Sequence, residues 1–333
     1  MKRFGLVLLA FVLAGLASLG VLYRWVNFQG RADGNPVSVF IEQGTSGRAI
    51  AQQLEKQNVV DSALAFRIYL RTRNVNADLR AGKYELKTSM AFEDLVEELK
   101  RGPEVKFVKL VVPEGFTIDQ TAAQVEKLTH IKAADFLAAA SPKGVKPAIL
   151  PPGVETLEGF LYPATYYVIE QETAEGLVKR MVAEFEKRSK AVGIDQASAV
   201  QRTPFEILVI ASMIEEEAKE DPERDEISAV IHNRLKKGIP LGIDATIQYA
   251  VKKYHGEPLT ESDLAIDSPF NSRLRQGLPP WPIASPRDKS IKAALNPADV
   301  NFLYYVLKDC RTHLFTADYD EFSRAKQRMP TNC

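Results

Sequence analysis

A run of twenty residues without a charged side chain, Phe4 to Tyr23, is the feature that most constrains this chain. At a rise of about 1.5 Å per residue, a helix of that length spans about 30 Å, the thickness of the hydrocarbon core of a bilayer. The alternative is a cleaved signal peptide, which has a shorter apolar region that ends in small residues. Residues 19–23 make a poor cleavage site, so we expect a retained transmembrane helix over 4–24.

The orientation of this helix follows from what lies on its two sides. The tail at 1–3 contains two basic residues, but Arg24 lies on the other flank, so the charges alone do not fix the orientation. The C-terminal side must carry all of the folded part. We therefore expect a single-pass protein with its N-terminus on the cytoplasmic side of the membrane. A polar linker at 25–36 and the folded part are expected on the outer side.

Composition excludes several classes of function. With 43 basic and 43 acidic side chains, the chain has no basic excess that would indicate a nucleic-acid binder. Two cysteines, Cys310 and Cys333, are too few for a disulfide framework or a Cys-pair zinc motif, and they either pair or stay free. The four histidines lack metal-ligand spacing, and the motifs of serine hydrolases and nucleotide-binding loops are absent. We expect neither a metal nor a cofactor.

The remaining sequence divides into two α+β parts. Residues 37–105 are expected to form a small α/β module that carries no evident chemistry, and its plainest interpretation is a spacer or docking module. Residues 106–333 are expected to form a larger α+β domain with its core at 203–330. The predicted elements are strands at 37–41, 82–86, 105–112 and 166–169, helices at 49–57, 62–73 and 91–101, and a closing hairpin at 302–307 and 313–316.

The most informative segment begins at Thr203, which forms a capping box with Glu206 around a proline at the first helical position. Residues 207–214 are apolar nearly all round, which predicts a buried helix. This helix runs directly into three glutamates, Glu215, Glu216 and Glu217.

Glu215 continues a stripe that includes Leu208, Ala211 and Ser212 at helical spacing, so it is expected to lie on a buried face. Burial disfavours the charged form of a carboxyl group, which suits a general acid near neutral pH. The alternative is that the three glutamates only solvate the end of the helix. Further on, Asp221 with Pro222 is expected to cap a second helix that ends near Lys237, and Asp244 to cap a third over 245–254.

Several ordered motifs resemble the YceG-like family of endolytic murein transglycosylases. The motifs are ASMIEEE at 211–217, ERD at 223–225, NRL at 233–235, DATIQY at 244–249, SPFN at 268–271 and GLPP at 277–280. Two earlier segments, VPEG at 112–115 and LEGFLYP at 157–163, also resemble this family, and residues 37–105 are similar to its LysM-like subdomain. The resemblance covers nearly the whole chain.

The resemblance implies a lyase that cuts peptidoglycan glycan strands internally and leaves 1,6-anhydro-N-acetylmuramic acid ends. It implies a location on the bacterial inner membrane with the catalytic domain in the periplasm, beside penicillin-binding synthases, and no cofactor. The catalytic glutamate of the family falls on Glu215 and a second motif acid on Glu217. Polar side chains that can orient the sugars or Glu215, or serve only as caps and ion pairs, are Ser212, Glu217, Arg224, Asn233, Asp244, Thr246, Tyr249 and Asn271.

A single carboxyl group can suffice for this reaction. Ordinary glycosidases use two, but the 6-hydroxyl of the muramic acid attacks C1 here, so one group can act first as acid and then as base. Arg224 has two open interpretations: it forms a plain salt bridge near Glu217, or it faces Glu215, in which case it would lower the pKa of that group and weaken it as an acid. Two alternatives stay open. One is a non-catalytic wall-binding scaffold, and the other is a water-using muramidase with a second carboxylate, Asp244 first.

Overall fold

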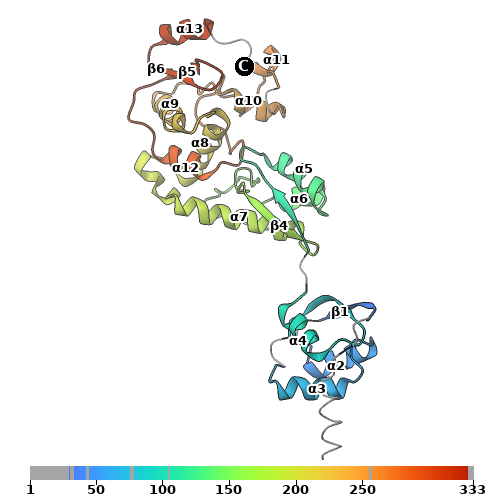
Figure 1. Ribbon diagram of the computed structural model, residues 1–333. Coiled ribbons are helices and arrows are strands. Elements are labelled where there is room, and N and C mark those ends of the chain that lie inside the picture. The colour runs from blue at the N-terminus through green and yellow to red at the C-terminus, as the bar shows by residue number, and fades with distance from the viewer. Residues whose placement is uncertain are drawn as a thin grey trace, which may run out of the picture. The chain divides into compact units, whose positions relative to one another are not determined.

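The computed structural model describes residues 30, 34–42, 45–75, 79–103, 106–254 and 257–328. It divides into two compact units between Lys106 and Phe107 (Figure 1). The transmembrane helix expected over 4–24 lies outside the described residues, as does the tail at 1–3. Within the described ranges, no helix is both long enough and apolar enough to cross a bilayer.

The first unit packs three helices beside one antiparallel strand pair, β1 (Pro36–Ile41) and β2 (Gly82–Lys87). The helices are α2 (Gly47–Lys56), α3 (Ala63–Thr72) and α4 (Phe92–Arg101). Side-chain oxygens of Ser46 and Ser62 accept the capping hydrogen bonds of α2 and α3. The strands and helices expected in this module are therefore present, while its LysM-like character stays a prediction.

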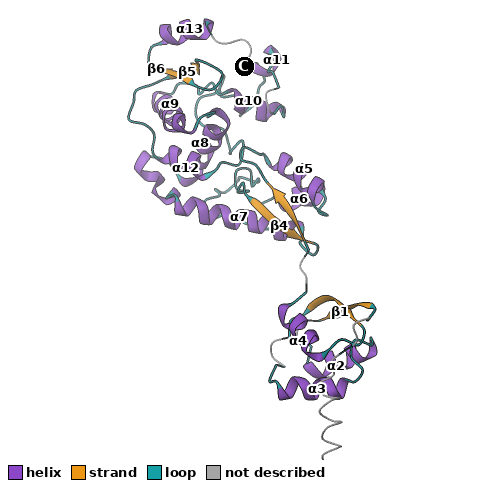
Figure 2. Ribbon diagram, viewed as in Figure 1, coloured by secondary structure: helices purple, strands orange, loops and turns teal. Residues whose placement is uncertain are grey.

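The second unit is mostly helical, with two small antiparallel strand pairs, β3–β4 and β5–β6 (Figure 2). Its elements are β3 (Phe107–Val111), α5 (Ile118–Leu128), α6 (Ala133–Ala139), β4 (Thr165–Ile169), α7 (Ala174–Ala191), α8 (Pro204–Glu217), α9 (Arg224–Lys237), α10 (Asp244–Val251), α11 (Glu261–Leu264), α12 (Asp288–Leu295), β5 (Tyr304–Leu307), β6 (His313–Thr316) and α13 (Tyr319–Gln327), with 3-10 turns at Ile194–Val200 and Asp221–Glu223. The α+β class expected from the sequence is confirmed.

Helix α8 runs through the core of this unit and is buried continuously from Ile207 to Glu215. Its start matches the predicted capping box, because Thr203 accepts a hydrogen bond from the backbone N–H of Glu206 and the Glu206 carboxylate accepts one from that of Thr203. Helices α9, α10 and α12 pack around α8. The last turn of α8 is therefore the point at which a buried helix reaches polar surroundings.

Two predicted caps are wrong. Asp221 lies in a 3-10 turn and its carboxylate is taken by Arg224 and Lys289, so α9 begins at Arg224 without a side-chain cap. Asp244 is the first residue of α10, and its carboxylate accepts a hydrogen bond from Arg273 Nε at 2.8 Å. In both cases a nearby cation competes successfully for an aspartate that would otherwise cap.

Helix α10 ends at Val251, earlier than expected, because Lys252 adopts a left-handed conformation with a φ of 55°. Helices α12 and α13 were not predicted.

The cysteine at position 310, near the C-terminus, is disulfide-bonded, so the thiol of Cys310 does not remain free.

Candidate active site

The carboxylate of Glu215 lies at the end of α8 and is held by four donors. Its Oε2 accepts hydrogen bonds from the backbone N–H of Arg287 and the hydroxyl of Ser290, both at 2.9 Å. Its Oε1 accepts one from Arg287 Nε at 2.9 Å and lies 3.3 Å from Arg224 Nη2. The residue is only 8% exposed, so these protein groups replace the solvent around its charge.

The two guanidinium groups differ in their surroundings. Arg224 is buried, and it also donates to the Ser290 hydroxyl at 2.5 Å and to Asp221 at 3.2 Å. The side chain of Arg287 is 35% exposed, and its Nη1 lies 4.0 Å from both Glu114 and Asp221. Arg287 thus forms the outer cover of Glu215, with two other carboxylates in reach.

Of the two interpretations of Arg224, the structure has the second, since Arg224 faces Glu215. Two cations and two neutral donors therefore surround the Glu215 carboxylate.

Glu217 belongs to a different environment. Its Oε2 accepts a hydrogen bond from the hydroxyl of Tyr305 on β5, at 2.8 Å. Burial raises the pKa of Glu217, and the Tyr305 hydrogen bond opposes this effect. Burial and the neighbouring Glu217 in turn raise the pKa of Tyr305 well above its ordinary value.

Glu216 lines a cavity of about 120 Å³ between the segment that leads into α5 and helix α10. The full lining is Glu114, Gly115, Thr117, Gln120, Glu216, Ala245, Gln248, Tyr249, Lys253, Tyr254 and Ile283. Part of the Glu216 side chain is open to solvent. Loss of water around its carboxyl, with added repulsion from Glu215 and Glu217, raises its pKa to about 7.

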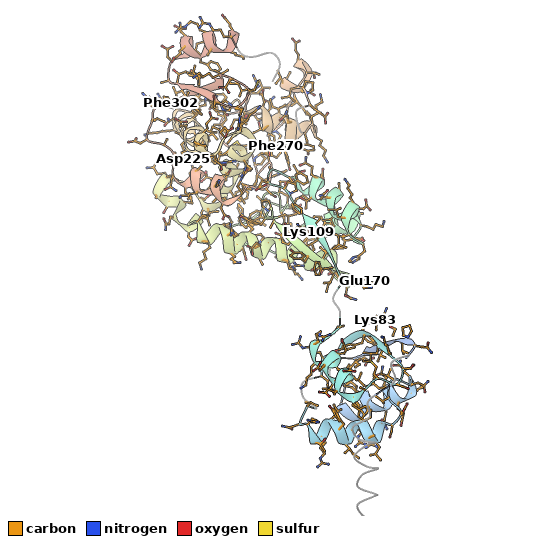
Figure 3. All side chains as sticks on the ribbon, in the orientation of Figure 1. Lys83, Lys109, Glu170, Asp225, Phe270 and Phe302 are labelled. Atoms are coloured by element: carbon orange, nitrogen blue, oxygen red, sulfur yellow. The ribbon has the colours of Figure 1, made fainter. Side chains whose placement is uncertain are left out.

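A buried chain of polar groups supports one wall of this cavity. Trp281 Nε1 donates to the hydroxyl of Tyr249 at 2.9 Å, and that hydroxyl donates to Glu158 at 3.3 Å. Glu158 also accepts from the backbone N–H of Ile118, the first residue of α5, at 3.0 Å. Burial raises the pKa of Glu158 to about 8. Phe270, labelled in Figure 3, packs against the rings of Tyr249 and Trp281.

The other predicted polar residues hold the framework. Ser212 accepts from the backbone N–H of Ile283 at 3.1 Å and so fixes one residue of the cavity lining. Thr246 bonds the Ser272 hydroxyl at 2.9 Å, and Asn271 donates to the carbonyls of Leu264 and Ile266.

Neither Asn233 nor Asp244 lines the cavity. Asn233 donates to the carbonyls of Val300 and of Phe302, which Figure 3 labels. Asp244 is taken by Arg273. Of the supporting residues that the sequence singled out, Arg224 contacts Glu215 and Tyr249 lines the cavity.

Three residues of this site were not found by sequence reasoning: Arg287, Ser290 and Glu158. Arg287 and Ser290 lie far along the chain from Glu215. Arg287 is the N-cap of α12 and Ser290 lies within it, and no capping motif predicts this helix. Glu158 belongs to the LEGFLYP segment that carried the family resemblance, which was the one available signal. In the part of the chain that the structure describes, no three His, Cys, Asp or Glu side chains are grouped as metal ligands.

The fold and the site define a mixed α+β protein with a buried acidic centre beside a small polar cavity. The model of the YceG-like family matches residues 39–328, so the chain belongs to that family. It is 31% identical to the endolytic murein transglycosylase of Bacillus subtilis over 309 residues, which cover 88% of this chain and 84% of the relative.

Two further comparisons agree with this assignment. An endolytic murein transglycosylase of Streptococcus pneumoniae is 32% identical over 313 residues, and the chain spans only 56% of that relative's length. A crystal structure of a YceG-like protein of Listeria monocytogenes matches 88% of this chain and 99% of its own, with 31% identity and a TM-score of 0.57.

Proposed function

We propose that this protein is a peptidoglycan lytic transglycosylase, an enzyme of the lyase class that cuts glycan strands internally. The family assignment and the name shared by its relatives support this activity. The observation that carries the proposal is the Glu215 carboxylate, buried at the end of α8 and held in one position by Arg287, Arg224 and Ser290.

Glu215 is the acid and base of the proposed reaction. Protonated Glu215 gives its proton to the glycosidic oxygen as the bond between C1 of N-acetylmuramic acid and that oxygen breaks. The 6-hydroxyl oxygen of the same sugar bonds to C1, and Glu215 takes the hydroxyl proton. The carboxyl group is thus regenerated, no water is consumed and the new end is a 1,6-anhydro sugar.

Arg287 must leave Glu215 before the first proton transfer. A carboxyl group that two cations hold is a poor acid, and Arg287 is the more exposed of the two. Glu114 and Asp221 lie 4.0 Å from its Nη1 and offer it other partners. A glycan strand that enters the cavity beside Glu114 would move the Arg287 guanidinium toward the carboxylates of Glu114 and Asp221.

The setting of the enzyme is also part of the proposal. The apolar run at 4–24 would anchor the chain in the bacterial inner membrane, with the enzyme on the periplasmic side. The LysM-like module at 37–105 would hold glycan, and penicillin-binding synthases would supply nascent strands whose elongation the cut terminates. These statements rest on the sequence pattern and the family resemblance.

Mass spectrometry of the products tests the reaction. Purified full-length chain and its Glu215→Gln variant are incubated with uncrosslinked glycan strands, and Glu220→Gln, altered in an exposed ion pair with Arg311, is the matched control. We expect internal fragments with anhydro ends from the unaltered chain and the control, and none from Glu215→Gln. Reducing ends would indicate a muramidase, and no cleavage by any chain would indicate a scaffold.

A further inference from the structure

The carboxylates of three successive glutamates at the end of α8 are in three different environments. Glu215 is saturated by protein donors, and Glu217 accepts from Tyr305. Within the described ranges, no protein group donates a hydrogen bond to the carboxylate of Glu216. It lies in the wall of the cavity, with its side chain still exposed to solvent.

The backbone opposite Glu216 is shaped to admit its carboxyl group. A Cβ atom at Gly115 would lie 2.5 Å from Glu216 Oε1, so a larger residue there would displace the end of this side chain. Gly115 has a φ of 77°, and its N–H donates to the carbonyl of Ser285 at 3.0 Å. This hydrogen bond holds the backbone that faces Glu216 against the segment that contains Ser285.

The charges that face Glu216 come from several elements. Glu215 and Glu217 lie on its own helix, and Glu114 precedes α5. Lys253, which follows α10, lines the same cavity, but its ammonium group is bound to Asp263 at 2.6 Å. The surroundings thus leave Glu216 without a committed cation, and partial desolvation with repulsion from Glu215 and Glu217 raises the pKa of its carboxyl to about 7.

A glutamate that only solvates a helix end would be fully ionised at neutral pH and need not line a cavity. Glu216 lines the cavity beside Glu215 and its pKa is raised to about 7, so its exposed acceptor oxygens are available to a partner from outside the chain. Sugar hydroxyls and acetamido N–H groups are neutral donors of the kind that a carboxylate binds strongly.

We propose that Glu216 contacts the bound glycan and accepts a hydrogen bond from a sugar hydroxyl or acetamido N–H in the cavity beside Glu215. This inference rests on the proposed function, because it takes the glycan as the ligand. The acceptor is the ionised carboxylate, so glycan binding weakens as the pH falls through about 7 and Glu216 takes up a proton.

The test measures KM and kcat of the full chain on soluble uncrosslinked glycan strands between about pH 6 and pH 8, on either side of that pKa. For Glu216→Ala we expect KM to rise about tenfold with little change in kcat, the loss of a hydrogen bond to a charged group. For Glu216→Gln we expect the rise of KM at low pH to flatten. Glu220→Gln, the exposed control, keeps both properties of the unaltered chain.

Wild-type KM and an unchanged pH dependence in both Glu216 variants would overturn the inference. If the unaltered chain does not cut strands, the proposed reaction fails, and Glu216 is then tested by binding alone. In that case strand binding to the Glu215→Gln chain is compared with and without Glu216→Ala. A tenfold loss of affinity would support the glycan contact, and equal affinity would refute it. Unfolding transitions confirm that each variant is folded.

Discussion

Arg224 and Glu215 form a buried ion pair: Arg224 Nη2 lies 3.3 Å from Glu215 Oε1, and both side chains are 3% exposed. Each charge of this pair has further partners: Arg287 and Ser290 also contact Glu215, and Asp221 also contacts Arg224. The pair joins the start of α9 to the end of α8.

Replacement of Arg224 by Ala is expected to lower the free energy of unfolding by about 3 kcal/mol, because it removes one partner of a buried pair and leaves the other partly unsatisfied. Denaturant unfolding of the full chain measures the loss. The control is Arg311→Ala, whose pair with Glu220 is exposed and should contribute less than about 1 kcal/mol. Equal effects of the two substitutions would contradict this account.

Replacement of Arg287 by Ala is expected to change the rate rather than the fold. Its guanidinium covers Glu215 and has to leave before the proposed proton transfer, so its removal should raise kcat severalfold. Initial rates on glycan strands measure the change, with Arg273→Ala as a control, since its partner is Asp244. A lower rate would mean that Arg287 positions Glu215 instead of covering it.

Glu158 is expected to make stability depend on pH. Its pKa is raised by burial from 4.5 to about 8, so the folded state retains a proton that the unfolded state releases. This contribution is fully present below about pH 4.5 and is lost as the pH rises through about 8. Relative to the unaltered chain, Glu158→Gln should therefore gain stability as the pH rises. The free energy of unfolding of both chains is measured at low and high pH. A difference between the two chains that does not change with pH would show that the Glu158 proton is not linked to folding.

Alanine substitutions at Gly115 and Gly153 distinguish the effect of backbone strain from the effect of contact with Glu216. Gly115 and Gly153 both have positive φ angles, 77° and 87°, so alanine at either position should cost about 1–2 kcal/mol of stability. Around Gly153 there is open space, whereas a Cβ at Gly115 would meet Glu216. We expect only Gly115→Ala to alter KM for glycan strands. Identical kinetics in both variants would argue against a fixed position of Glu216.

Local sequence signals predicted α8 well and α12 not at all. Helix α8 has a proline at its first position, a capping box and an apolar run, and its bounds agree with the prediction. Helix α12 has only eight residues, and Arg287 at its N-cap makes no side-chain capping bond. Its existence depends on packing against α8, which a reading of neighbouring residues does not reveal.

The same distinction explains the site. Glu215 was singled out because its place on a buried stripe is a local property of one helix. The identity of its partners is a tertiary property. Arg224 is seven to nine residues beyond the glutamates, and the sequence leaves open which of them it faces, while no local signal links Arg287 to Glu215. The caps expected from Asp221 and Asp244 failed for this reason too, since cations from elsewhere in the chain took both carboxylates.

The backbone of Gly115 and Phe116 exchanges two hydrogen bonds with Ser285, one in each direction. This short ladder joins the segment before α5 to the segment that carries Arg287. Truncation from the N-terminal side through Gln120 would remove one wall of the cavity while it leaves the motifs from 157 onward in place. A shortened chain would thus keep the ASMIEEE motif around Glu215 and still lack part of its site.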